Sequence, residues 1–280
     1  MKLAGVVVWY HPNINDVQNI FSYINDLDRL YIFDNSDNKN NRKFVPDSKK
    51  IKYISKKKNL GIATALNYAA KEAIREGYEF LLTMDQDSKF KKNDFKKLKA
   101  LASKIDWSKI GIISPWHNTK LKVTKPKEKI DYPIDVMTSG NIVNLEIFSK
   151  LKGFKDFLFI DGVDIEYCLN LKKNGYKIMR CNTIELTHDL GNIFYRNFLG
   201  KEFMCDNHNY LRVYYMTRNY RYIRKLYHDI APEFCDKLIK IKGLIFKIIF
   251  FENDKFRKLR SIFWGILDYQ SAKYGKCERM

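Results

Sequence analysis

The stretch Glu79–Phe90, EFLLTMDQDSKF, joins an apolar run to two carboxylates. Phe80-Leu81-Leu82 has the composition of a buried strand, and Asp85 and Asp87 follow it with one residue between them. One interpretation of this pair is a solvated surface turn. The other is a divalent cation site, because hard oxygen ligands suit Mg²⁺ or Mn²⁺. The rest of the sequence decides between them.

Upstream of this stretch, strand-like segments alternate with helical ones. The predicted strands are Ala4–Tyr10, Arg29–Ser36, Lys49–Lys58 and Tyr78–Ser88, and the predicted helices are Ile14–Asp26 and Asn59–Gly77. The order β-α-β-β-α-β predicts an α/β fold in which helices flank a mostly parallel sheet.

Polar residues gather where these strands end. They are His11, Asp34, Asn59–Ala63, Asp85 and Asp87. Because ligands bind beyond the carboxyl ends of strands in open α/β sheets, this order favours a ligand site over ordinary turns.

Two further polar centres lie downstream. Asp161, Asp164 and Glu166 precede and enter a helical apolar pattern, so helix capping is an alternative explanation for them. His188 follows the strand-like segment Thr183–Leu186, and a lone histidine is more often structural than a ligand.

The composition indicates which binding partners and which cellular compartment to expect. The chain of 280 residues carries a formal net charge of +19, which is typical of proteins that meet nucleic acid, an anionic membrane face or a phosphorylated substrate. Its five cysteines form no CxxC pair, which favours a reducing compartment. With no signal-peptide pattern and no apolar run long enough to cross a bilayer, we expect a cytoplasmic protein, peripheral on the inner face of the cell membrane.

Taken together, these centres resemble family 2 glycosyltransferases of GT-A (Rossmann-like) fold, and most of all the bacterial rhamnosyltransferases of cell-surface polysaccharide biosynthesis. The resemblance covers roughly residues 3–225. It rests on VVVWYHP, IFDNSD, NLGIATALNYA, LLTMDQDS, MTSGNIVNLEIFSKLKGF, LFIDGVDIEYCLNLKKNGYKI and THDLGN. It implies a catalytic domain at 1–205, with a nucleotide-sugar half at about 1–90 and an acceptor half at about 91–205, and a basic, aromatic helical extension at 206–280.

The resemblance also implies roles for individual residues. Those implied to line or pack against the nucleotide are His11, Asp34, Asn59, Gly61 and Asn67. Asp85 would contact ribose or a metal-bound water, Asp87 would bind Mn²⁺ or Mg²⁺ directly, and His188 would lie near the metal or the diphosphate. Ser139 and Gly140 would lie beside the bound sugar, where a glycine permits close backbone approach.

The catalytic base implied by the resemblance is Asp164. Val163 stands where many relatives have the first residue of a Glu-Asp pair, so the assignment stays open between Asp164 and the nearby Asp161. The implied reaction is a single displacement with inversion. The sugar that the resemblance favours is L-rhamnose, with dTDP-rhamnose as its donor. The implied acceptor is a lipid-linked glycan in capsule, O-antigen or cell-wall polysaccharide assembly. Another UDP- or dTDP-sugar donor is the alternative within this class.

The region Asp206–Met280 has its own character, with 16 Lys and Arg against 8 Asp and Glu interleaved with aromatic residues. Helices that simply pack on the core are one interpretation, and a membrane-surface anchor is the other. A nucleic-acid-binding protein is the rival from a different class, but no such binding motif is present and we expect no nucleic-acid partner. A nucleotidyltransferase would need a glycine-rich phosphate loop at the first strand, and Val7–Asp16 has none.

Overall fold

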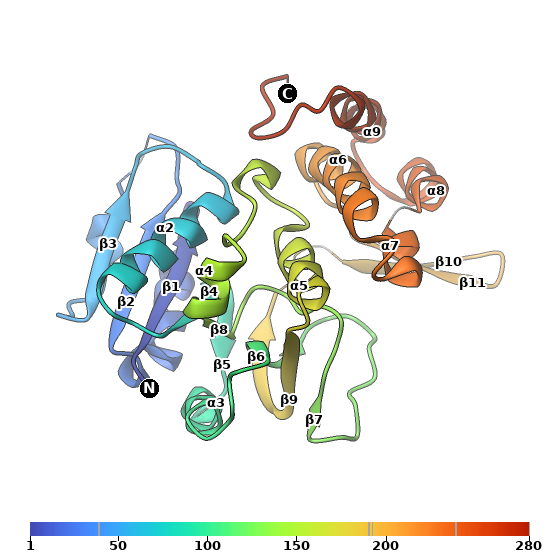
Figure 1. Ribbon diagram of the computed structural model, residues 1–280. Coiled ribbons are helices and arrows are strands. Elements are labelled where there is room, and N and C mark those ends of the chain that lie inside the picture. Colours follow the sequence, from blue (N-terminus) through green and yellow to red (C-terminus); the bar gives the residue numbers. More distant parts are fainter. Residues whose placement is uncertain (39, 190, 192, 239, 280) are drawn as a thin grey trace.

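The computed structural model shows a curled, mixed sheet with helices on both faces and further helices at one end (Figure 1). The structure describes residues 1–38, 40–189, 191, 193–238 and 240–279. The strands are β1 Leu3–Trp9, β2 Arg29–Asp34, β3 Ile51–Ser55, β4 Phe80–Asp85, β5 Ser88–Phe90, β6 Ile110–Asn118, β7 Ile130–Asp131, β8 Asn141–Asn144, β9 Lys177–His188, β10 Phe194–Phe198 and β11 Lys201–Cys205. The helices are α1 Ile14–Asn19, α2 Ile62–Arg75, α3 Asp94–Ala102, α4 Leu145–Lys150, α5 Val163–Lys173, α6 Tyr210–Tyr227, α7 Pro232–Leu238, α8 Ile241–Phe251 and α9 Lys255–Gln270.

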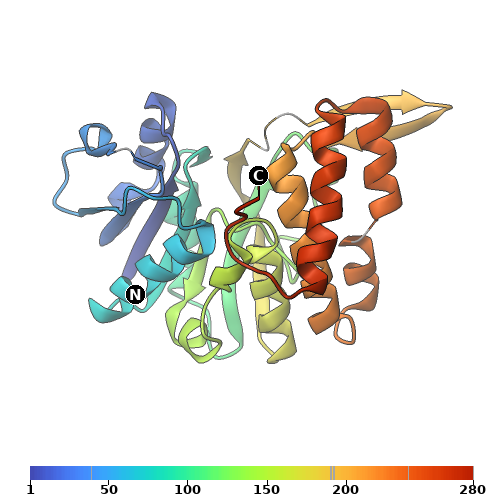
Figure 2. The same ribbon diagram turned by 90° about the horizontal axis from the view of Figure 1, so that it is seen from above.

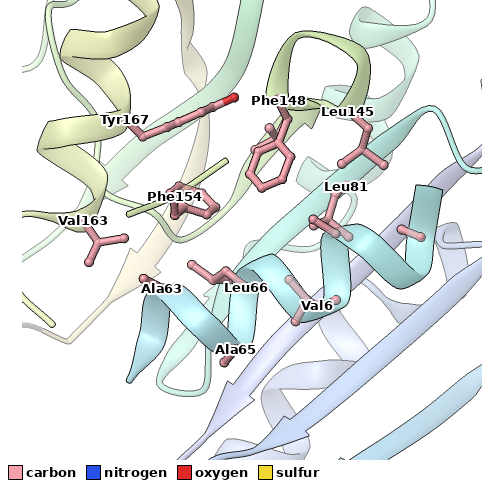
Figure 3. Close-up of a cluster of buried hydrophobic side chains, with 14 of the residues drawn as sticks. Val6, Ala63, Ala65, Leu66, Leu81, Leu145, Phe148, Phe154, Val163 and Tyr167 are labelled. Atoms are coloured by element: carbon pink, nitrogen blue, oxygen red, sulfur yellow. The ribbon is translucent and has the colours of Figure 1, made fainter. Parts of the chain in front are cut away.

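Strand β1 lies at the centre of the core, and all seven of its residues are buried. Val6 and Val8 point into the cluster that α2, α4 and α5 cover, part of which Figure 3 shows. Val7 and Trp9 point to the opposite face, which α1 and α3 cover. Successive side chains of a strand alternate between its two faces, so a strand buried on both faces has to be apolar throughout. The predicted α/β class with a helix-flanked sheet is confirmed.

The strand order is β3-β2-β1-β4-β8-β6-β9-β5, with β7 pairing β9. The parallel pairing predicted from the sequence holds from β3 to β4. Beyond β4 the sheet is mixed, because β8 runs antiparallel to both β4 and β6 and β5 runs antiparallel to β9. Only Gln86 and Asp87 separate β4 from β5, yet β5 does not pair with β4 and instead pairs with β9 at the other end of the strand order.

The helices after residue 206 pack on the sheet domain through α5. Helix α6 contacts α5 on one side and α9 on the other. The final segment returns toward the sheet, where the Gly275 amide donates to the Phe157 carbonyl at 2.7 Å and Lys276 lies 3.8 Å from Asp37. Figure 2 shows this segment between the sheet and the C-terminal helices. No helix in the described part of the chain combines the length and the apolar character that crossing a bilayer requires.

Candidate active site

Asp85 ends β4 and Asp87 follows it two residues later, and β9 brings His188 to this pair. Ser88 of β5 pairs with His188, the last residue of β9. The His188 Nδ1 atom is 2.5 Å from the Ser88 hydroxyl and 3.4 Å from an Asp87 carboxylate oxygen. Asp85, Asp87 and His188 each offer a ligand atom within 4.8 Å of the others. A residue 100 positions away in the sequence thereby joins the two strand-end carboxylates.

The electrostatics of this cluster favour a cation. Burial raises the pKa of Asp85, and the neighbouring Asp87 charge raises it further while His188 opposes both. Burial alone lowers the pKa of His188, but the hydrogen bond to Asp87 and the charges of Asp85 and Asp87 outweigh it and leave the pKa raised. Two carboxylates and an imidazole form a donor set that Mn²⁺ or Mg²⁺ accepts, so the residues fit a divalent metal.

Asp164 lies in the first turn of α5, after Gly162 in a left-handed conformation. Its carboxylate accepts a hydrogen bond from the Ile165 amide at 2.9 Å. Burial raises the pKa of Asp164 to about 6, and the charges of Asp135, Asp85 and Asp161 add to the effect. A carboxylate with this pKa is ionised at neutral pH and still basic enough to take a proton.

Asp161 differs from Asp164 in having a strong partner. The Arg212 guanidinium of α6 contacts its carboxylate through Nε at 3.0 Å and through a second nitrogen. Such a two-point pair fixes both side chains and neutralises the carboxylate. Asp164 has no cationic partner among the described residues, so it is the freer of the two carboxylates.

Both centres open into one cleft of about 930 Å³. Asp85, Asp87 and His188 line it from the sheet, and Asp164 lines it from α5. The C-terminal region completes the wall with Asp206, Asn207, His208, Asn209, Arg212, Tyr220, Asn253, Asp254 and Lys258. A cleft of this volume is large enough for a nucleotide-sized ligand.

Comparison with known proteins identifies the class of protein to which this cleft belongs. Residues 13–149 match the model of the family described as "Glycosyl transferase family 2". The dTDP-rhamnosyl transferase RfbF of Shigella flexneri is 24% identical over 265 residues, which cover 89% of this chain and 86% of that protein. The chain carries a family 2 glycosyltransferase domain. It is therefore a glycosyltransferase by class, as the sequence motifs predicted.

Solved glycosyltransferase structures share the fold of this family 2 chain. S. aureus TarS 1-349 in complex with UDP-GlcNAc superposes with a TM-score of 0.57 at 15% identity, covering 97% of this chain and 81% of that one. GalNAc-T7 with UDP, GalNAc and Mn²⁺ gives a TM-score of 0.55 at 12% identity. That match covers 96% of this chain but only 56% of GalNAc-T7.

Asp34 and Ser139, which the motifs placed at the ligand, are not among the residues that line this cleft. Asp34 is fully buried and accepts hydrogen bonds from the backbone of Ser36 and Asn41, and from the Tyr53 hydroxyl. Ser139 is also fully buried, and its hydroxyl accepts from the Asp85 amide at 3.1 Å. The two side chains thus shape the sheet edge and present no exposed atom to a ligand.

Asn67 and Gly140 also make their close contacts with the protein. The Asn67 amide donates to the Phe154 carbonyl at 2.8 Å and to Asp156 at 2.6 Å, so it tethers the loop before α5. Gly140 has φ of +80°, and a Cβ there would meet Leu186 and Pro115 at 2.9 Å. Its missing side chain therefore permits the close approach of Leu186 and Pro115.

The remaining predicted residues lie near the ends of β1 and β3. Asn59 accepts from the Asn35 amide and from the backbone of Gly61, and thereby closes the turn into α2. A Cβ on Gly61 would lie 2.6 Å from the Phe159 carbonyl oxygen, so this position also packs against protein. His11 lines a separate hollow of about 400 Å³. Leu190 and Asn192 of the THDLGN stretch lie outside the described residues.

Sequence reasoning missed the α6 residues that hold the loop before Asp164. Asn219 is fully buried, and its amide donates to the carbonyls of Leu158, Ile160 and Asp161 at 2.8–2.9 Å. Arg218, which is 1% exposed, donates to the Phe157 carbonyl and also to the Leu158 carbonyl that Asn219 contacts. In the sequence these residues belong to a run of cations and tyrosines that is typical of a solvated helix, so nothing local marks them as buried.

Proposed function

We propose that this protein is an inverting glycosyltransferase that moves L-rhamnose from dTDP-rhamnose onto a lipid-linked glycan during assembly of a bacterial capsule, O-antigen or cell-wall polysaccharide. One observation carries the mechanism: Asp164, with a pKa raised to about 6, shares a cleft with the cluster of Asp85, Asp87 and His188. The similarity to a dTDP-rhamnosyl transferase over most of the chain supports the choice of donor.

Asp85, Asp87 and His188 would hold the divalent metal. A metal held there would supply positive charge to neutralise the diphosphate of the donor. The cleft needs that positive charge, because its lining residues include Asp85, Asp87, Asp161, Asp164, Asp189, Asp206 and Asp254. Its only fully charged cations within the described residues are Arg212 and Lys258, and both are paired with carboxylates. Mn²⁺ bound to GalNAc-T7 supports manganese as the first metal to test.

Asp164 would act as the general base. An acceptor hydroxyl attacks the anomeric carbon from the face opposite the diphosphate and forms the new glycosidic bond. Its proton passes to the Asp164 carboxylate, and the bond between the anomeric carbon and the diphosphate oxygen breaks, releasing the nucleoside diphosphate. We favour Asp164 over Asp161 for this step because the Arg212 pair already engages Asp161.

The C-terminal region would place the enzyme on the inner face of the membrane. The β10–β11 hairpin packs on α8 through Phe198, Phe203, Phe246, Phe250 and Phe251. Around this cluster large apolar side chains reach solvent: Leu199 is 88% exposed, Phe256 79% and Phe250 54%. Exposed Lys201, Lys242, Lys255 and Arg260 lie on the same elements. Apolar side chains flanked by cations fit an anionic lipid surface.

A different donor is the second candidate, since TarS, which shares the fold, is known in complex with UDP-GlcNAc. Both candidates are tested by binding and hydrolysis of a panel of dTDP- and UDP-sugars with Mn²⁺, with Mg²⁺ and with EDTA. We expect metal-dependent binding of dTDP-rhamnose that Asp87→Ala abolishes. The control is Asp47→Ala, which removes an exposed carboxylate remote from the cleft and should bind as the wild type does. Preference for a UDP-sugar selects the second candidate, and binding of no donor by the folded protein rejects both.

Co-sedimentation with vesicles tests the membrane surface separately. We expect binding to vesicles that contain phosphatidylglycerol, little binding to pure phosphatidylcholine, and a decline as salt rises. Phe250→Ser with Phe256→Ser should weaken the binding. Phe21→Ser, at an exposed phenylalanine of the sheet domain, is the matched control. Equal binding by the double variant and the wild type would contradict this part of the proposal.

A further inference from the structure

The C-terminal region lines the cleft with residues that belong neither to the metal cluster nor to the base. The charges that act on Asp85 are those of His188, Asp87 and Arg212. The charges that act on His208 are those of Arg212, Asp161, Asp206 and Glu252. Arg212 acts on both groups, and the C-terminal region also contributes His208, Tyr220, Asn253, Asp254 and Lys258 to the cleft wall, which together are called the far end of the cleft.

This far end presents polar groups without partners. His208 and Tyr220 are half-buried and line the cleft, and among the described residues neither the imidazole nor the phenol hydroxyl has a hydrogen-bond partner. The exposed Asn253 amide lines the same cleft and is equally free within the described chain. Half-buried polar groups in a cleft that lack protein partners are available to a ligand.

The charges at this end exclude an anionic ligand. Its two cations are committed, Arg212 to Asp161 and Lys258 to Glu252 at 2.9 Å. Lys258 is only 2% exposed and also donates to Asn207 at 2.8 Å. Asp206 lies 3.6 Å from Lys247 and Asp254 lies 3.8 Å from Arg257, so these carboxylates are paired as well. Although the chain carries a net charge of +19, this part of the cleft therefore offers a carboxylate or phosphate no free cation among the described residues.

We propose that His208, Tyr220 and Asn253 form the subsite for the terminal sugar of the acceptor, and that this sugar is uncharged and offers free hydroxyl groups. The inference rests on the proposed glycosyltransferase function. A neutral imidazole supplies one donor and one acceptor, a phenol supplies both, and an amide supplies both, which matches the vicinal hydroxyls of a sugar. The tyrosine ring adds an apolar face for the sugar's C–H groups.

The position of this subsite suits an acceptor attached to a lipid. Asn253 and Asp254 form the turn between α8 and α9, and Phe256, two residues later, is 79% exposed. One short turn thus joins the sugar end of the cleft to the apolar, cationic surface proposed to meet the membrane. The acceptor's sugar would lie in the cleft while its lipid stays at that surface.

The test compares binding and glycosylation of matched octyl glycosides by the purified full chain. The neutral probes are the octyl glycosides of glucose, galactose, rhamnose and N-acetylglucosamine, and the charged probe is octyl glucuronide, which differs from octyl glucoside by a carboxylate. We expect at least one neutral glycoside to be an acceptor, with kcat/KM for octyl glucuronide about tenfold or more below that for octyl glucoside. Preference for the glucuronide, or no binding of any neutral probe by a protein that binds its donor, overturns the proposal.

Two variants test the residues themselves. His208→Ala and Tyr220→Phe should each raise the acceptor KM about tenfold, the value of one lost hydrogen bond, while the donor Kd stays within about twofold. Tyr222→Phe, on the same helix but outside the cleft, is the matched control. An unchanged acceptor KM, or a donor Kd that rises in step with it, contradicts the subsite. Failure of the wild type to bind any donor is a different result, because it rejects the proposed function instead.

Discussion

The two walls of the cleft use charge in opposite ways. On the wall formed by the sheet and the first turn of α5, called the sheet wall, Asp85, Asp87 and Asp164 have no close cationic partner in the described chain other than the His188 imidazole. On the wall formed by the C-terminal helices, called the helical wall, Arg212 of α6 pairs with Asp161 and Lys258 of α9 pairs with Glu252. Unpaired carboxylates remain available to a metal or a proton, whereas paired ones fix the positions of the elements that carry them. The contrast predicts that substitutions on the first wall impair chemistry and those on the second impair stability.

The largest expected effect is that of Asp164→Asn. An amide cannot accept the acceptor's proton, so transfer should slow by about 10³-fold if Asp164 is the base. The donor Kd, measured by calorimetry with Mn²⁺ present, should change little. Asp161→Asn is the control, because it removes a carboxylate that the geometry assigns to Arg212. If Asp161→Asn slows transfer more than Asp164→Asn does, at an equal fraction of folded protein, then Asp161 is the base and Asp164 is not.

The second effect concerns the buried pair of Lys258 and Glu252, both of which are 2–3% exposed. Lys258→Met leaves the Glu252 charge buried without its partner, which should lower the free energy of unfolding by about 3 kcal/mol in urea denaturation. The double variant Lys258→Met with Glu252→Gln should recover most of that loss, because neither buried charge remains. Equal destabilisation by the single and double variants would show that the pair contributes nothing beyond its packing.

The same contrast explains which parts of the site the sequence could reveal. The end of β4 was predictable because an apolar strand and its terminal carboxylates are consecutive in the chain, and because the parallel register places Val8 of β1 beside Asp85. His188 was found through a motif. Its contact with Ser88 depends on the antiparallel pairing of β5 with β9, which strand propensity does not specify.

The helical wall could not be predicted in this way. Arg218 and Asn219 meet the loop before Asp164 from about 60 residues further along the chain, and the segment around them is rich in cationic and aromatic residues. Only the packing of α6 on α5 distinguishes a buried arginine from a solvated one. Burial is equally hard to predict for Asp34 and Ser139. Their positions at a strand end and in a motif indicated a ligand contact, and both side chains are fully buried.

The third effect tests the loop that these α6 residues hold. Phe159 and Asp161 have φ of +67° and +62°, a conformation that costs non-glycine residues about 1 kcal/mol or more each. Asn219→Ala removes the three bonds to this loop and leaves buried carbonyls unpaired, so we expect a loss of about 2 kcal/mol of unfolding free energy. Asn174→Ala, at the exposed end of α5, is the matched control and should cost less than about 0.5 kcal/mol. A similar small loss in Asn219→Ala would mean that the loop keeps its conformation unaided.

The smallest effect, and the most specific to the sheet wall, is the pH dependence of transfer. The reaction requires ionised Asp164, and burial with the charges of Asp135, Asp85 and Asp161 raises its pKa to about 6. As pH falls through 6 the base takes up a proton, so kcat/KM should drop about tenfold by pH 5, a change of about 1.4 kcal/mol. Circular dichroism over the same range shows whether the protein stays folded. An inflection near pH 4, where an ordinary aspartate titrates, would mean that Asp164 is solvated in the working enzyme, and the distinction between the two walls would then lose its electrostatic basis.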